Sequence, residues 1–266
     1  MSQMSSLRGS IKRKFPQLVQ AVWLGRLVKN QIKYPVVATV LDWPGKIAGG
    51  PFKGMRFPRS GGSSHYYEVL GVYEQCLAPL VEDIIRRQPK VIIDVGASWG
   101  YYALGFAYRC PTTKVIAYEM DASRADILRK FRWLNGLMER VEIQGECTVQ
   151  RLREDLAQAP GALIFMDVEG AEDILLRPDH LAELRDAEIV VELHEMFAPG
   201  IGNRLKERFA ATHILTIIPQ TPSRQLERLD APANRLLRFY WNSMTNEHRA
   251  EDMAWMHLVP NAAAKA

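Results

Sequence analysis

The sequence predicts an α/β fold in which helices cover a doubly wound, mostly parallel sheet of seven strands, preceded by an N-terminal helical extension. Three observations point to this fold. The chain has 266 residues, 47% of them hydrophobic, which is enough for one large core. From Lys90 onward, short apolar or β-branched runs alternate with amphipathic stretches, as in parallel α/β sheets. A glycine-containing turn, GASWG, directly follows the first of these runs.

The elements follow in order along the chain. The runs predicted as strands are residues 91–95, 114–119, 141–145, 162–167, 188–193, 213–218 and 253–259. Five helical crossovers connect them, and one is bracketed clearly: Asp121 is an N-cap for ASRADILRKFRWL, and the pair Asn135 and Gly136 ends it. The segment 63–89 ahead of the first strand is also predicted to be helical, with Pro89 as its end.

We expect two regions. Residues 1–62 form a basic helical segment followed by a Gly- and Pro-rich irregular connector, and residues 63–266 form the main domain. Residues 1–41 contain seven Lys or Arg and no Asp or Glu, although the whole chain carries a formal charge of only +4. Apolar residues at helical spacing within 8–34 predict a stripe that packs on the main domain, with contact to an anionic membrane surface as the alternative.

Cysteine usage and apolar runs bear on location. Cys76, Cys110 and Cys147 are spaced neither as a disulfide framework nor as a clustered zinc site. The apolar runs near the N-terminus are shorter than the roughly 20 residues that a membrane span needs. We therefore expect a cytoplasmic protein, with peripheral contact at the inner membrane face as the alternative.

The first strand ends at a turn suited to a small ligand. Asp94 closes the strand, and Gly96 and Gly100 let the backbone turn tightly ahead of a helix N-terminus. The spacing differs from the GxGxxG turn of dinucleotide-binding folds, so a nicotinamide cofactor is disfavoured. Glu119 ends the second strand, where its carboxylate can accept hydrogen bonds from the ribose hydroxyls of a nucleoside-containing cofactor.

Four segments in this order, DVGASWGYYA, AYEMD, MDVEGAE and VVELHE, resemble the signature segments of FkbM-type methyltransferases, a class I S-adenosylmethionine-dependent family. The resemblance covers roughly residues 65–218. It implies a Rossmann-like methyltransferase sheet and S-adenosyl-L-methionine as cofactor. It also implies that Asp94, Gly96 and Gly100 line the methionine end, Glu119 holds the ribose, and Glu146 and Cys147 lie near the adenine. The full set of expected cofactor-binding residues is Asp94, Gly96, Ala97, Ser98, Gly100, Tyr101, Glu119, Glu146, Cys147 and Asp167.

The fourth and fifth strands supply the candidate catalytic residues. Asp167 and Glu169 are close enough in sequence to raise one another's pKa, which favours a group that accepts a proton from a hydroxyl. His194 is an alternative base because imidazole titrates near neutrality. Together with Glu192 these residues form an alternative metal site, but side chains at a buried strand end also satisfy one another, so no metal is expected.

Methyl transfer to a hydroxyl of a sugar, lipid-linked or polyketide-like acceptor is therefore the predicted activity. Nucleic acid is disfavoured as a substrate, because MDVEG stands where an amino-directed nucleic-acid enzyme has Asn or Asp followed by Pro-Pro and an aromatic residue. A non-catalytic binding module with a methyltransferase fold is a further alternative. The sequence does not indicate an oligomeric state.

Overall fold

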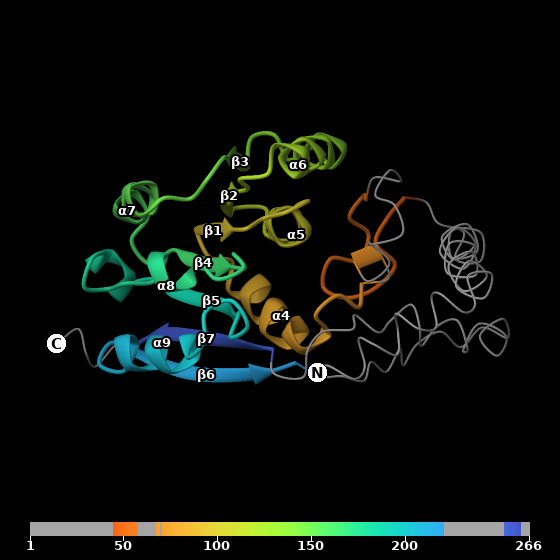
Figure 1. Cartoon of the computed structure of the whole chain (residues 1–266). Helices are drawn as coiled ribbons and strands as arrows, with labels where there is room; N and C mark the ends of the chain where they lie inside the picture. The colour runs from red at the N-terminus through yellow and green to blue at the C-terminus, as the bar shows by residue number, and fades with distance from the viewer. Residues whose placement is uncertain (1–44, 58–67, 70, 221–252, 262–266) are drawn as a thin grey trace, which may run out of the picture. The chain divides into compact units, whose positions relative to one another are not determined.

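The computed structural model describes residues 45–57, 68–69, 71–220 and 253–261, and Figure 1 shows their arrangement. The predicted basic helix within residues 8–34, with its proposed membrane contact, lies outside these residues. Among the residues described, no helix combines the length and the apolar character that crossing a membrane requires.

A seven-stranded sheet forms the centre of the domain (Figure 1). Its strands are β1 (Val91–Val95), β2 (Lys114–Tyr118), β3 (Val141–Gln144), β4 (Leu163–Met166), β5 (Glu188–Leu193), β6 (His213–Pro219) and β7 (Ala254–Pro260). Their order is β3-β2-β1-β4-β5-β7-β6, and β7 runs antiparallel to both of its neighbours. The prediction of a doubly wound, mostly parallel sheet of seven strands is confirmed.

Strand order reverses between β1 and β4, because β2 and β3 lie on one side of β1 whereas β4 and β5 lie on the other. In a doubly wound sheet, ligands bind at the carboxyl ends of the strands beside such a reversal. The sequence-predicted site residues Asp94, Glu119, Asp167 and His194 lie at the carboxyl ends of β1, β2, β4 and β5, respectively.

Helices connect the strands, as predicted. They are α4 (Ala78–Arg87), α5 (Tyr101–Arg109), α6 (Ala122–Leu134), α7 (Val149–Gln158), α8 (Glu172–Leu175) and α9 (Ile201–Phe209), with the short 3-10 helices η2 (Gln75–Leu77) and η3 (Ala182–Arg185). The Asp121 side chain accepts the amides of Ser123 and Arg124, which confirms it as the N-cap of α6. Helix α6 ends before Asn135, also as predicted.

Among the described residues, the helical prediction for 63–89 is confirmed at 68–69 and 78–87 and is wrong at 71–74. Residues 71–74 form a turn, and α4 begins only at Ala78, with Pro79 in its first turn. Gly71 has φ +73°, and a Cβ there would lie 1.9 Å from the carbonyl oxygen of Gly49. The chain therefore leaves the helical path because it packs against the backbone of a distant segment, and Pro79 fixes where the helix can start.

In the described part of the Gly- and Pro-rich connector, residues 45–57, the chain forms turns and an isolated bridge, as predicted, but it contributes to the core of the main domain. Phe52 and Met55 are fully buried. The Ile47 amide donates to the carbonyl of Met55 at 2.8 Å. On α5, Gly105 leaves room for the ring of Phe52, since a Cβ at position 105 would lie 2.5 Å from it. Residues 58–67, which contain the predicted boundary at 62 and 63, lie outside the described part of the chain.

The carboxyl ends of β1 and β4 approach each other very closely at Gly96. A Cβ at Gly96 would lie 1.8 Å from the carbonyl oxygen of Asp167, and the backbone there has φ +86°. The Asp167 amide donates to the carbonyl of Val95 at 2.9 Å, which continues the β1–β4 pairing. Only glycine satisfies both the conformation and the contact.

Replacing Gly96 with Ala is therefore expected to lower the free energy of unfolding by about 3–5 kcal/mol, from backbone strain and from a clash with backbone that cannot rotate away. Gly136→Ala is the matched control, because Gly136 also has positive φ (+66°) but nothing lies within 4 Å of a Cβ there. It should cost only about 1 kcal/mol. Urea unfolding of both variants tests the contact, and equal losses would contradict it.

Candidate functional site

The turn after β1 is bound to the end of β2 by its own backbone. The amides of Gly96 and Ala97 both donate to the carbonyl of Tyr118, at 3.0 and 2.9 Å. The Ser98 amide donates to Oε2 of Glu119 at 2.8 Å, with Ser98 itself at φ +49°. These three amides already donate hydrogen bonds within the protein. The turn would therefore contact a ligand through its surface rather than through these N–H groups.

Glu119 holds this arrangement together. Its side chain is buried, and its second oxygen, Oε1, accepts the amide of Asp121 at 2.7 Å. One carboxylate therefore joins the glycine turn to the start of α6. Each carboxylate oxygen has two acceptor positions, so both oxygens retain capacity for a ligand hydroxyl. The predicted contact with a ribose is compatible with this geometry.

One side-chain oxygen of Asp94 lies in the core of the site without a hydrogen-bond partner. The side chain is buried, and Oδ2 has no hydrogen-bond partner. Burial raises the pKa of Asp94 to about 8, and the negative charges of Asp167, Glu119 and Glu74 add to this shift, while a hydrogen bond from the backbone of Ala103 opposes it. A buried carboxylate among other carboxylates is stabilised by a cationic ligand.

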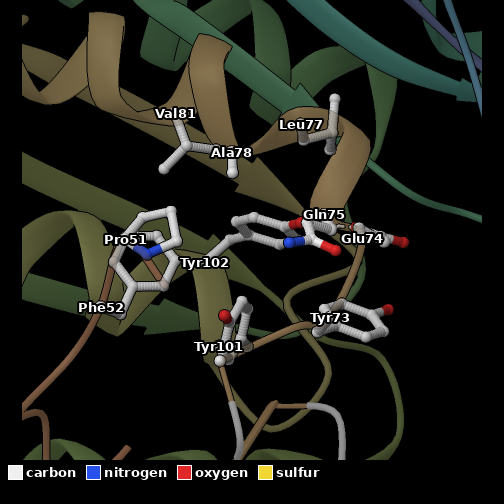
Figure 2. A pocket seen from close by; sticks show the side chains of 11 residues that line it. Pro51, Phe52, Tyr73, Glu74, Gln75, Leu77, Ala78, Val81, Tyr101 and Tyr102 are labelled. Atoms are coloured by element: carbon white, nitrogen blue, oxygen red, sulfur yellow. Dashed lines mark hydrogen bonds between the residues drawn. The ribbon is translucent and has the colours of Figure 1, made fainter. Parts of the chain in front are cut away.

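An aromatic pocket adjoins the turn (Figure 2). Tyr102 donates to Oε2 of Glu74 at 2.6 Å, and burial together with the charge of Glu74 raises the pKa of Tyr102 above its ordinary value. Tyr101, expected to contact the cofactor, is buried with its ring 5.1 Å from Phe52 and 5.3 Å from Tyr73. Its observed contacts are therefore packing contacts within the lining of this pocket.

The residues expected near the adenine follow β3, on the outer side of β2. Glu146 is exposed, whereas Cys147 is half-buried against the core. Burial and the charge of Asp155 raise the pKa of the Cys147 thiol to about 12, so it is neutral at physiological pH. Their contact with a cofactor stays a prediction.

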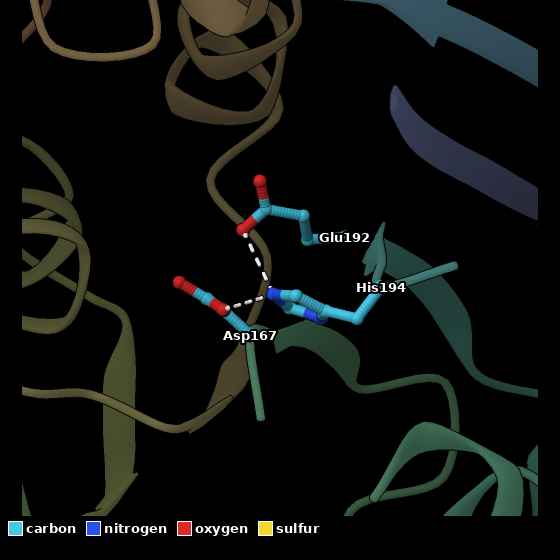
Figure 3. A group of neighbouring side chains, drawn as sticks. All are labelled: Asp167, Glu192 and His194. Atoms are coloured by element: carbon cyan, nitrogen blue, oxygen red, sulfur yellow. Dashed lines mark ion pairs between the residues drawn. The ribbon is translucent and has the colours of Figure 1, made fainter. Parts of the chain in front are cut away.

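A second cluster lies at the carboxyl ends of β4 and β5 and contains Asp167, Glu192 and His194 (Figure 3). Nε2 of His194 lies 3.4 Å from Oδ1 of Asp167 and 3.6 Å from Oε2 of Glu192. Exposed fractions are 3% for His194, 2% for Glu192 and 32% for Asp167, so only the aspartate reaches solvent appreciably. We call these three residues the histidine cluster.

The other ring nitrogen of His194 is held by Glu172, the first residue of α8. Oε1 of Glu172 lies 2.6 Å from Nδ1, and the side chain of Glu172 has no exposed surface. Burial lowers the pKa of His194, but the hydrogen bond with Glu172 and the charges of Asp167, Glu172 and Glu169 outweigh it and raise the pKa. Glu172 thus fixes the orientation of the imidazole.

The structure brings together only part of the predicted catalytic set. Asp167 and His194 meet, whereas Glu169 is exposed, adopts φ +53° and lies outside the histidine cluster. Glu172 was not among the predicted residues. Its one sequence signal is its place in DVEGAE, two residues after Gly170, in the segment most typical of the resemblance.

Comparisons with known proteins add only structural neighbours. No family model and no curated protein matches this sequence. Similar solved structures include the O-methyltransferase TomG from Streptomyces achromogenes in complex with S-adenosylmethionine, at 16% identity and TM-score 0.48, covering 74% of this chain and 87% of that one. An O-methyltransferase from Bacillus cereus in complex with S-adenosylhomocysteine shares 14% identity at TM-score 0.45, covering 87% and 90%.

A Klebsiella pneumoniae protein, provisionally classed as an O-methyltransferase, shares 21% identity at TM-score 0.48 over 71% of this chain and 80% of its own. Likeness at this level does not assign a ligand or a reaction to the present chain. Those depend on its own residues.

The raised pKa of Asp94 predicts a pH dependence of stability. Because the pKa is about 8 in the folded chain and 3.8 as the ordinary value, the folded state binds more protons between these limits. Stability from this group is fully present below about pH 4 and declines as pH rises to about 8, by up to about 6 kcal/mol.

Asp94→Asn removes this titration, so its stability relative to the parent chain should rise from pH 4 to pH 8. Urea unfolding of both proteins across this range, without added ligand, measures the difference. Parallel stability curves for the two proteins would contradict the assignment.

Proposed function

We propose that this chain is an S-adenosylmethionine-dependent methyltransferase that methylates a hydroxyl oxygen. The observation that carries the proposal is Asp94, a buried carboxylate with an unpaired oxygen at the carboxyl end of β1, beside the turn braced by Glu119. The FkbM resemblance supports the same reading, with a sugar, lipid-linked or polyketide-like compound as the acceptor class.

The charge of the site favours this cofactor over a dinucleotide. Asp94 experiences the negative charges of Asp167, Glu119 and Glu74. S-adenosylmethionine carries a cationic ammonium and a cationic sulfonium, whereas a dinucleotide carries an anionic pyrophosphate. Opposite charges lower the cost of a buried carboxylate and like charges raise it. The site therefore attracts the first cofactor and repels the second.

Two groups of residues at the carboxyl edge of the sheet would bind the cofactor and the acceptor. Asp94 would bind the ammonium, and Glu119 would accept the ribose hydroxyls while it braces the turn. When bound, the sulfonium supplies an activated methyl group: the acceptor oxygen forms the new C–O bond, the C–S bond breaks with its electron pair going to sulfur, and the acceptor loses its proton. The histidine cluster would orient the hydroxyl and assist the departure of this proton.

Calorimetry with S-adenosylmethionine tests the cofactor half. We expect the parent chain to bind it, and Asp94→Asn to weaken binding by at least about 10-fold, because an ion pair in a buried site is lost. The control is Asp126→Asn, which removes the same charge from an exposed position on α6, 66% exposed. A folded parent chain without affinity for the cofactor would refute the proposal.

The acceptor half is tested by turnover. His194→Ala and Asp167→Asn should retain cofactor affinity while lowering the rate of methyl transfer by about 100-fold, a typical loss for a proton-transfer group. The assay follows labelled methyl groups from S-adenosylmethionine into an extract of the cells that express the chain, with identification of the labelled product. Unchanged transfer in both variants would remove these residues from the mechanism, and cofactor binding with no labelled product would favour a binding module.

A further inference from the structure

The histidine cluster contains three different side chains that converge on one point. Asp167, Glu192 and His194 each offer one ligand atom, and these atoms all lie within 4.8 Å of one another. Figure 3 shows both carboxylates directed at the same ring nitrogen. They come from the ends of two adjacent parallel strands, which fixes their spacing through the β4–β5 pairing.

The distances are long for hydrogen bonds. N–H to O hydrogen bonds are about 2.7–3.2 Å long between heavy atoms, whereas Nε2 lies 3.4 Å from Asp167 and 3.6 Å from Glu192. Moreover, Nε2 carries at most one hydrogen and so cannot satisfy both carboxylates. Two ligands at right angles around a cation, each about 2.1–2.6 Å from it, are separated by about 3.0–3.7 Å. The observed spacing matches that of cation ligands.

The orientation of the imidazole gives an independent indication. Oε1 of Glu172 lies 2.6 Å from Nδ1. With Glu172 as the acceptor, Nδ1 carries the hydrogen, and Nε2 is the ring nitrogen that faces the two carboxylates. A histidine that binds a metal typically donates its other N–H to a carboxylate in this way.

The charge of the cluster points in the same direction. Glu172 is fully buried and Glu192 is 2% exposed, and both surround a single imidazole together with Asp167. A divalent cation bound at Nε2 would lower the electrostatic energy of these carboxylates.

We propose that Asp167, Glu192 and His194 bind a divalent cation of the Mn²⁺ or Mg²⁺ type, with Glu172 as the residue that positions His194. Two carboxylates favour these cations, and one imidazole nitrogen favours Mn²⁺ over Mg²⁺. Gly96 packs directly against the backbone of Asp167, so the cation lies beside the turn that would hold the cofactor.

The role of the cation rests on the proposed function, although its binding does not. A bound cation lowers the pKa of an acceptor hydroxyl placed next to it, and the proton released passes to water. The hydroxyl oxygen is then a better nucleophile for the methyl carbon at neutral pH.

The test is a Mn²⁺ titration of the tag-free, chelator-treated full chain without S-adenosylmethionine, followed by the loss of the free Mn²⁺ signal in electron paramagnetic resonance. We expect one Mn²⁺ per chain, displaced by Mg²⁺. Asp167→Asn and His194→Gln should each weaken binding at least about 10-fold. Asp126→Asn, an exposed carboxylate on α6, is the matched control and should bind as the parent chain does.

Circular dichroism checks that each variant is folded. The half-exposed Asp167 keeps the test valid if replacement of the buried His194 prevents folding. Absence of saturable Mn²⁺ binding by the folded parent chain would overturn the proposal, as would equal affinities in all variants. Cofactor binding without Mn²⁺ binding would overturn this inference alone, whereas Mn²⁺ binding without cofactor affinity would overturn the proposed function and leave the cation site standing.

Discussion

The close approach of Gly96 to the backbone of Asp167 is the constraint on which the rest of the site depends. It occurs where strand order reverses, between β1 and β4, so it joins the two halves of the sheet at their carboxyl ends. On one side are Asp94 and the turn held by Glu119, and on the other is the histidine cluster. Because the contact is between backbone atoms, the distance between the two halves does not depend on any flexible side chain.

The site contains buried charged groups that a bound cation would stabilise. Asp94 has an unpaired oxygen in the core, and two buried carboxylates, Glu172 and Glu192, lie beside the one imidazole of His194. In a protein of ordinary stability, such groups lower the free energy of unfolding. They persist where a positively charged partner compensates them, and this is why charge discriminates among candidate ligands better than shape does here.

Much of the fold was predictable, and the reasons are local. Parallel strands such as β4 and β5 are buried on both faces, so they appear in the sequence as continuous apolar runs. Asp121 and Asn135 mark helix ends through side-chain and turn chemistry of their immediate neighbours. The turn at 71–74 was not predictable, because its path is set by contact between Gly71 and the distant Gly49.

The site residues, too, were predictable where strand ends place them and not where long-range packing does. Positions at strand ends, including Asp94, Glu119, Asp167 and His194, were identified because topology alone brings them to one edge. Glu172 was missed because it lies at the start of a helix, where an acidic residue is common for reasons of helix capping and dipole. Its partnership with His194 joins residues 22 positions apart and depends on how α8 packs against β5.

The β6–β7 pair has a consequence for how the protein can change. Seven consecutive residue pairs hold these strands together, from His213 with Pro260 to Pro219 with Ala254, and Ala254 also pairs with Leu193, the neighbour of His194. The chain therefore leaves the sheet after Gln220 and re-enters it at Met253 beside the histidine cluster. A shift in the register of β6 against β7 would therefore also move Ala254 relative to Leu193, next to the histidine cluster.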